Sequence, residues 1–269
     1  MAGFKEVLVR TRTAVILIGI LAVVLWLDSI FLPLLLAMVI FFATNEYFRF
    51  LHRKDIYPHT LAVLLPALAI PFIVHFCLPL LVCLGLFLFF IILLSILRYP
   101  GSRYKPKFLS ELTAAVFGIV YLSLLPSTII PLRQMGLWIC LTPLCLTWLY
   151  DSFAYFVGSA TGRHKMAPTI SPKKSWEGTI AGFILTFPCA WLLLRFVRPQ
   201  LTVVDAAVIT IGIGVIGTTA DLLESAMKRE VDLKDSSNVF PGHGGVLDRI
   251  DSLIFNLPFF YLYLISRGS

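Results

Sequence analysis

The residues best suited to chemistry lie in a polar stretch between two long apolar segments near the C-terminus. Four of them follow one another at helical spacings of three and four, so they share one stripe of a helix: Asp221, Glu224, Ser225 and Lys228. Asp248 and either Asp251 or Ser252 share a face at the start of the next apolar segment. Carboxylates from two facing helix ends, without Cys or clustered His nearby, suit a hard cation. The pattern therefore predicts that Asp221 and Asp248 jointly hold Mg²⁺ beside substrate phosphates, and a second cation stays open.

Basic residues flank this carboxylate pair. Lys228, Arg229 and Arg249 are placed to neutralise phosphate charge near a point of group transfer. A simpler interpretation stays open, in which Asp221 and Asp248 only form ion pairs with Lys228 and Arg249, as carboxylates at helix ends often do.

A glycine-rich turn, Pro241–Gly245, lies in the sequence between Asp221 and Asp248. Its glycines allow backbone N–H groups to approach an anion, and it leads into a helix N-terminus, which also attracts phosphate. We therefore expect Gly244 and Gly245 to bind a phosphate group. We expect His243 to donate a hydrogen bond to phosphate or to the loop backbone, and not to act as a general base.

A second polar segment, residues 162–178, carries four cations: Arg163, Lys165, Lys173 and Lys174. Pro172 is expected to enter a helix whose first turn carries Ser175 and Glu177, with the two lysines at its positive end. Such an arrangement suits a polyanion such as a triphosphate. The alternative is a basic loop that only fixes topology.

Asp151 differs from these residues because it falls inside an apolar segment. An isolated carboxylate in a membrane span is costly, so we expect it to face the site. Pairing with a basic residue is the alternative.

The elements that position these residues are membrane helices. Hydrophobic residues make up 58% of the 269 residues, charged residues only 14%, and the mean hydropathy is +0.89, whereas a soluble domain carries about 25% charged residues. The apolar runs are continuous, which excludes the alternating pattern of barrel strands. The sequence predicts an all-α polytopic membrane protein forming a single domain over 1–269, with N-terminal helices in 1–147 and catalytic helices and loops in 148–269.

Length and helix breakers predict about nine transmembrane spans. They lie near residues 13–27, 30–44, 61–76, 78–97, 112–131, 135–158, 178–195, 205–223 and 247–265. Residues 13–44 are too long for one span of a roughly 30 Å core, so two short helices are preferred to one.

The distribution of basic residues predicts the orientation. Of the 22 Lys and Arg, 18 fall in the N-terminus and in the loops 45–60, 98–111, 159–177 and 224–249. The positive-inside rule places these segments and the N-terminus in the cytoplasm. The net charge of +7 reflects this bias, so anionic lipids and phosphate-bearing substrates are expected partners and nucleic acid is not. The five cysteines lie in apolar segments without a CxxC pair and are expected to be small hydrophobes.

The polar segments resemble a known family. The matching residues of the long motif are Ser225, Met227, Lys228, Arg229, Lys234, Asp235, Ser237, Phe240, Pro241, His243, Gly244, Gly245, Asp248, Arg249 and Asp251. Two shorter runs match as well: Ser171 to Ser175 with Glu177 and Gly178, and Asp151 with Ala154 and Tyr155. Together they resemble the signature of the phosphatidate cytidylyltransferases, the CDP-diacylglycerol synthases, over about residues 148–251. Residues 1–147 show hydropathy only.

The resemblance implies an enzyme that joins CTP to phosphatidic acid, giving CDP-diacylglycerol and pyrophosphate, and it indicates a homodimer. With the orientation predicted above, we expect the enzyme in the cell's inner (plasma) membrane with its active site facing the cytoplasm. It extends the candidate substrate-binding set to Lys234 and Asp235, beside Ser171, Glu224 and Ser225. The candidate catalytic residues are Asp221, Lys228, Arg229, Asp248, Arg249 and Asp251.

Two other functions stay open. A transporter of a phosphorylated lipid would show paired halves with broken helices near the midplane, and these are not evident in the sequence. A CTP-dependent lipid kinase would use the same nucleotide. The helix pattern of CDP-alcohol phosphotransferases is absent from the sequence.

Overall fold

The computed structural model describes residues 2–27, 30–98, 107–237, 239 and 244–268, with the backbone alone at 2–10 and 14. The chain divides into two compact units. One unit contains Met1–Ile130 with Asp235–Arg249, and the other contains Pro131–Lys234 with Ile250–Ser269. The prediction of a single domain is not tested by this division.

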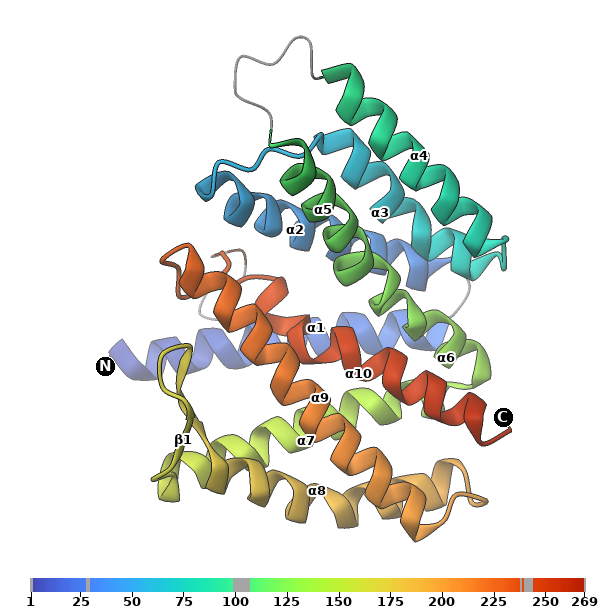
Figure 1. Ribbon diagram of the computed structural model, residues 1–269. Helices are drawn as coiled ribbons and strands as arrows, with labels where there is room; N and C mark the ends of the chain where they lie inside the picture. The colour runs from blue at the N-terminus through green and yellow to red at the C-terminus, as the bar shows by residue number, and fades with distance from the viewer. Residues whose placement is uncertain (1, 28–29, 99–106, 238, 240–243, 269) are drawn as a thin grey trace. The chain divides into compact units, whose positions relative to one another are not determined.

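The first unit is built from apolar helices, labelled in Figure 1. They are α1 (Ala2–Leu27), α2 (Phe31–Arg53), α3 (Thr60–His75), α4 (Leu80–Arg98) and α5 (Phe108–Ile119). Helices α2 and α5 meet where the buried Tyr47 hydroxyl donates to the Ala114 carbonyl at 3.1 Å, and the ring leaves no room for a side chain at Gly118. The segment 235–249 returns to this unit from the far end of the sequence.

A composite helix leads out of the first unit. After α5 the chain forms a π-helical turn, η2 (Val120–Leu124), and a short 3₁₀ turn, η3 (Pro126–Thr128), before α6 (Ile129–Met135). Pro126 has no N–H to continue the α-helical ladder, so the local widening precedes it. In η2, the buried Ser123 hydroxyl donates to the Ala67 carbonyl of α3 at 2.6 Å, which fixes the turn against its neighbour.

The second unit contains α7 (Leu137–Thr161), a hairpin of β1 (Lys165–Ala167) and β2 (Ser171–Ser175), α8 (Trp176–Val197), α9 (Val203–Glu230) and most of α10 (Leu247–Ser266). Helices α7, α8 and α9 lie side by side (Figure 1). Glycines allow the close approach: a Cβ at Gly178 of α8 would lie 2.5 Å from the Ala154 carbonyl of α7. Asn256 of α10 donates to Thr147 of α7 at 3.0 Å, which adds the last helix to the bundle.

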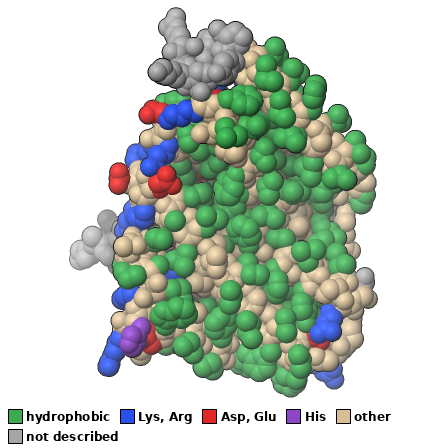
Figure 2. Space-filling model, in the orientation of Figure 1, with side chains coloured by type: hydrophobic (Ala, Val, Ile, Leu, Met, Phe, Trp, Pro, Cys, Tyr) green, Lys and Arg blue, Asp and Glu red, His purple; other side chains and the backbone are tan. Residues whose placement is uncertain are grey.

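Among the described residues, six helical stretches are long and apolar enough to cross a membrane: Phe31–Arg53, Leu80–Arg98, Phe108–Met135 (α5 to α6), Leu137–Thr161, Trp176–Val197 and Val203–Glu230. Apolar side chains also cover most of the surface drawn in Figure 2, and charged ones are sparse there. The protein is therefore an all-α membrane protein, as predicted. The count of nine spans and the cytoplasmic N-terminus stay predictions.

Helices occur at all nine predicted places, and residues 13–44 form two helices, as expected. Some helices extend beyond the predicted spans. Helix α2 continues to Arg53, so much of the predicted loop 45–60 is helical, and α9 continues to Glu230, as the predicted helical stripe from Asp221 to Lys228 requires. Hydropathy marks where apolar residues stop, whereas the hydrogen-bond ladder continues into polar residues.

Candidate functional site

The second polar segment forms a β-hairpin before it enters α8. The expectation that Pro172 enters a helix carrying Ser175 in its first turn is wrong, because Ser171–Ser175 is strand β2, paired antiparallel with β1. Ser175 is instead the N-cap of α8, and its hydroxyl accepts the Gly178 N–H at 3.3 Å. Glu177 does lie in the first turn, as predicted.

The strand separates the two neighbouring lysines, because successive side chains of a strand point to opposite faces. Lys173 is exposed, whereas Lys174 is partly buried. The Lys174 ammonium donates to the Thr218 carbonyl at 3.1 Å and forms an ion pair with Asp221 at 2.8 Å. Lys174 thus connects the hairpin with α9, through a contact to a residue 44 positions further along the sequence.

Three carboxylates gather around this ammonium group. Asp221 acts electrostatically on both Asp151 of α7 and Asp251 of α10, and Lys174 offsets part of the charge at each. The predicted site residue Asp151 therefore lies close to two other predicted ones, Asp221 and Lys174. Asp221 is thus paired directly with Lys174 and lies within electrostatic range of two further carboxyl groups.

The stripe predicted on the helix after Asp221 is present on α9. The Ser225 hydroxyl donates to Asp221 at 3.2 Å, and Lys228 forms an ion pair with Glu224 one turn away. Glu224 is almost completely buried. The simpler interpretation paired Asp221 with Lys228. That pairing is wrong, because Lys228 pairs with Glu224 and Asp221 pairs with Lys174.

Arg229 and the hairpin tip are held together at the end of α9. The Arg229 guanidinium donates to the carbonyls of Ile170 at 3.3 Å and Leu233 at 2.9 Å. Its neighbours in the motif, Lys234 and Asp235, are exposed. Arg229 thus fixes the hairpin turn through backbone contacts, and its predicted catalytic role is not tested by them.

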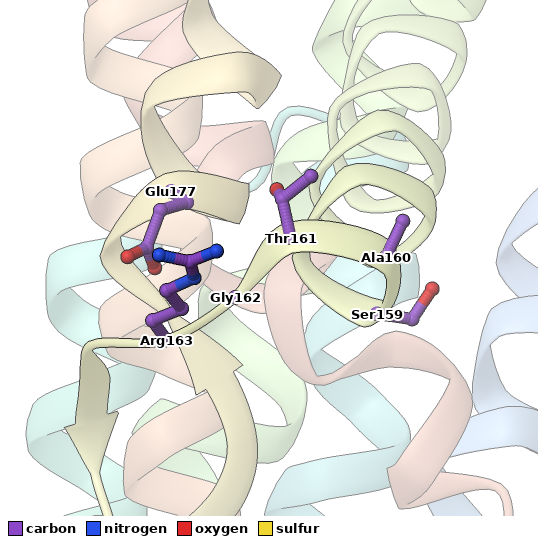
Figure 3. A pocket seen from close by; sticks show the side chains of 6 residues that line it. All are labelled: Ser159, Ala160, Thr161, Gly162, Arg163 and Glu177. Atoms are coloured by element: carbon purple, nitrogen blue, oxygen red, sulfur yellow. The ribbon is translucent and has the colours of Figure 1, made fainter.

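A pocket of about 480 Å³ lies beside the start of α8, lined by Ser159, Ala160, Thr161, Gly162, Arg163 and Glu177. Figure 3 shows the side chains of Arg163 and Glu177 directed toward each other across it. The Glu177 carboxylate also accepts the His164 backbone N–H at 3.1 Å and lies 2.6 Å from the His164 Nδ1. Glu177 therefore closes the turn between α7 and β1. Lys165, the next cation, is exposed.

The segment around Asp248 is ordered by hydrogen bonds to carboxylates of the first unit. Asp248 Oδ2 accepts the backbone N–H groups of Ser236 at 2.9 Å and Gly245 at 2.8 Å, and the Ser236 hydroxyl at 2.8 Å. Gly244 has φ of +80°, which a glycine adopts without strain, and a Cβ there would lie 2.8 Å from Asp248 Oδ2. The amide of Gly245 thus donates within the protein, and phosphate binding by Gly244 and Gly245 stays a prediction.

Glu46 is a residue that the sequence analysis missed. It is completely buried in α2, and its carboxylate accepts hydrogen bonds from the 235–249 segment. The available signal was its charge, since Glu46 is the only acidic residue of Phe31–Arg53. His243 lies outside the described residues, and Arg249 is exposed at the start of α10.

The fit of a divalent cation rests on the donor set. Asp151, Asp221 and Asp251 lie within electrostatic range of one another and provide carboxylate oxygens, the hard ligands that Mg²⁺ prefers. Among the residues that the structure describes, no cluster of three or more acidic, His or Cys side chains is arranged to hold a metal ion. A cation at Asp221 would therefore need movement of side chains, including that of Lys174.

These features define a class: an all-α membrane protein in which charged side chains cluster at the polar ends of its helices. The chain belongs to the cytidylyltransferase family, whose model matches residues 8–266.

Curated relatives carry more specific names. The chain is similar to the phosphatidate cytidylyltransferase of Haemophilus influenzae, 40% identical over 189 residues, which are 64% of each chain. It is also similar to the enzymes of that name from Thermotoga maritima (39% over 158 residues, 56% of this chain and 58% of the relative) and Bacillus subtilis (41% over 133 residues, 49% of each chain). The matched regions span about half to two thirds of these relatives.

Proposed function

We propose that this protein is a phosphatidate cytidylyltransferase, an enzyme that converts CTP and phosphatidic acid into CDP-diacylglycerol and pyrophosphate. The observation that carries the proposal is the contact between Lys174 and Asp221. It brings together two polar segments that each resemble part of the family signature. The names of the relatives support the same activity.

The chemistry is compatible with such a site. The phosphate monoester of phosphatidic acid is mostly dianionic at neutral pH, because its second pKa is about 6. One of its oxygens attacks the α-phosphorus of CTP, a new P–O bond forms, and the bond to the β-phosphate oxygen breaks to release pyrophosphate. Such a nucleophile needs no general base, so the protein has to align two polyanions and neutralise their charge.

Cations of the second unit are suited to this task. Lys173 is exposed on β2 and available to the outer phosphates of CTP, as is Arg163 beside the pocket of Figure 3. Lys174 holds the Asp221 carboxylate close to the hairpin, and it acts electrostatically on Asp151 and Asp251. Lys228 keeps Glu224 neutralised inside α9.

A divalent cation completes the proposal. Mg²⁺ would neutralise phosphate charge, with Asp221 and Asp248 as the carboxylates that the sequence pattern nominates. The nearby carboxyl groups of Asp151 and Asp251, which offer further oxygen ligands, support the part of Asp221 in this assignment. Replacement of either residue by Asn should abolish turnover while the protein still accumulates in membranes. Near-normal activity of Asp248→Asn across Mg²⁺ concentrations would remove Asp248 from the metal site.

We further propose that the enzyme lies in the cell's inner membrane with its polar segments in the cytoplasm, where CTP is available. The distribution of Lys and Arg supports this orientation. The lipid substrate would keep its acyl chains in the bilayer, beside apolar surface such as that drawn in Figure 2. A homodimer is the assembly that the family resemblance indicates.

The test is an assay of purified protein with CTP and phosphatidic acid. The proposal requires stoichiometric pyrophosphate and CDP-diacylglycerol. Release of CDP would indicate a lipid kinase. Absence of both nucleotide products, together with lipid movement across proteoliposomes, would indicate a transporter.

A further inference from the structure

Among the side chains of the first unit that the structure describes, Glu46 is the most deeply buried carboxylate. It lies on α2 near the end of the apolar part of the helix, and none of its surface is exposed. A carboxylate taken out of water is strongly destabilising unless hydrogen-bond donors replace the lost hydration. The contacts of Glu46 therefore have to account for its presence.

All four donors described for Glu46 come from the 235–249 segment. Ser236 Oγ donates to Oε2 at 2.8 Å and the Ser237 hydroxyl donates to Oε1. The Val246 N–H donates to Oε1 at 2.9 Å and the Leu247 N–H to Oε2 at 2.8 Å. Both oxygens of one carboxylate thus bind both ends of a segment that lies about 200 residues away in the sequence.

Two of these donors belong to the start of α10. Val246 directly precedes the helix and Leu247 is its first residue. The first N–H groups of a helix have no partner inside it and carry partial positive charge, so a carboxylate stabilises them. Glu46, a residue of α2, therefore caps the N-terminus of α10. Asp248 is the second residue of that helix.

The Glu46 carboxylate and the Ser236 hydroxyl leave no room for a side chain at position 245. A Cβ on Gly245 would lie 2.6 Å from both oxygens of Glu46 and would overlap the Ser236 hydroxyl. Position 245 thus requires glycine because of its packing against Glu46 and Ser236, independently of the proposed role of Gly245 in phosphate binding.

Ser236 links Glu46 to Asp248. Its hydroxyl lies 2.8 Å from Oε2 of Glu46 and 2.8 Å from Oδ2 of Asp248. A hydroxyl has one proton to donate, so the two carboxylates share it. A change at Glu46 therefore reaches Asp248 through one intervening side chain.

We propose that Glu46 is a positioning residue of the enzyme: it holds Ser236, Ser237 and the start of α10, and through them Asp248, in the geometry that the transfer reaction needs. This inference rests on the proposed function and assigns a role to the N-terminal half of the chain, for which the sequence pattern gave only hydropathy.

The experiment compares Glu46→Gln with Ser237→Ala and with Arg49→Gln, an exposed residue one turn further along α2 that serves as the matched control. Each full-length protein is purified and assayed with CTP and phosphatidic acid for pyrophosphate release. Amide hydrogen exchange is measured at residues 244–247 on the same samples. Glutamine keeps the size of the side chain but replaces one acceptor oxygen by a donor, so it faces N–H and O–H groups with the wrong polarity.

Glu46→Gln should lower kcat by about tenfold or more and leave the KM for CTP within roughly twofold, since the cations assigned to CTP belong to the other unit. Exchange protection at Val246 and Leu247 should fall by about tenfold. Ser237→Ala loses one donor and should lower kcat by roughly threefold. Arg49→Gln should match the wild type in both measurements.

Two results would overturn the proposal. One is an unchanged kcat in a variant whose amides at 246 and 247 have lost protection. The other is a KM for CTP that rises as much as kcat falls. If Glu46→Gln does not accumulate, Ser237→Ala decides by the same two criteria. If the wild type releases no pyrophosphate, the proposed function fails, while hydrogen exchange still decides whether Glu46 holds the segment.

Discussion

Replacement of Lys174 by methionine tests the centre of the second unit. Lys174 is the cation that the structure places against Asp221, with 20% of its side chain exposed and 33% of the aspartate's. Methionine keeps the length and the apolar packing of the stem but removes the charge. Asp151, Asp221 and Asp251 would then face one another without this ammonium group.

The magnitude follows from the contacts. A charge-assisted hydrogen bond is worth about 1.5–3 kcal/mol, and the partial exposure of Asp221 places this one near the lower limit. We therefore expect kcat/KM to fall by roughly tenfold, mainly through kcat, because about 1.4 kcal/mol corresponds to one factor of ten. The uncompensated negative charge should also lower the Mg²⁺ concentration that gives half-maximal activity.

The assay is pyrophosphate release from CTP and phosphatidic acid at several Mg²⁺ concentrations. Lys173→Met is the matched variant, because it changes the adjacent but exposed lysine of the same strand. It should raise the KM for CTP by about tenfold and leave kcat nearly unchanged. If Lys174→Met instead showed this KM effect alone, Lys174 would bind nucleotide and the account of the carboxylate cluster would be wrong.

Three further predictions concern stability and topology. Ser175→Ala removes the N-cap of α8 and should destabilise the protein by about 1 kcal/mol, measured as a lower thermal midpoint. Gly178→Ala forces a Cβ to 2.5 Å from the Ala154 carbonyl and should cost more, about 1–3 kcal/mol, by separating α7 from α8. In intact cells, a cysteine at Ser102 should resist membrane-impermeant thiol reagents and one at Ser266 should react, as the positive-inside orientation requires.

Each of these has a contradicting outcome. Equal thermal midpoints for Ser175→Ala and the wild type would show that the cap bond contributes nothing to stability. A smaller effect of Gly178→Ala than of Ser175→Ala would mean that the two helices separate easily. Labelling at both engineered cysteines would show an error in the number of spans.

The helices were predictable because continuous apolar runs are a strong signal. Their ends were not, since α2 continues through Asn45, Glu46 and Arg49 after the apolar run has stopped. The strand Ser171–Ser175 was also missed. Its proline and lysines are typical of a helix start or a loop, and its pairing partner, β1, is reached only after the chain reverses direction, which no local residue pattern indicates.

The candidate site was predictable in its residue types and only partly in its contacts. The sequence pattern nominated Asp221 and Lys174, and only the alternative interpretation gave Asp221 an ion-pair partner, which was Lys228 on the same helix. In the structure Lys228 pairs with the buried Glu224, and Asp221 pairs across the bundle with Lys174. Glu46 could not be assigned because its partners lie about 200 residues away, and no local spacing reports such a contact.

The most direct test of the central claim is the identity of the products formed from CTP and phosphatidic acid by the purified protein. With CTP labelled in its α-phosphate, the account predicts that the label enters the lipid fraction as CDP-diacylglycerol, with one pyrophosphate released per labelled lipid. Label that stays entirely in water-soluble nucleotides would contradict the proposed function.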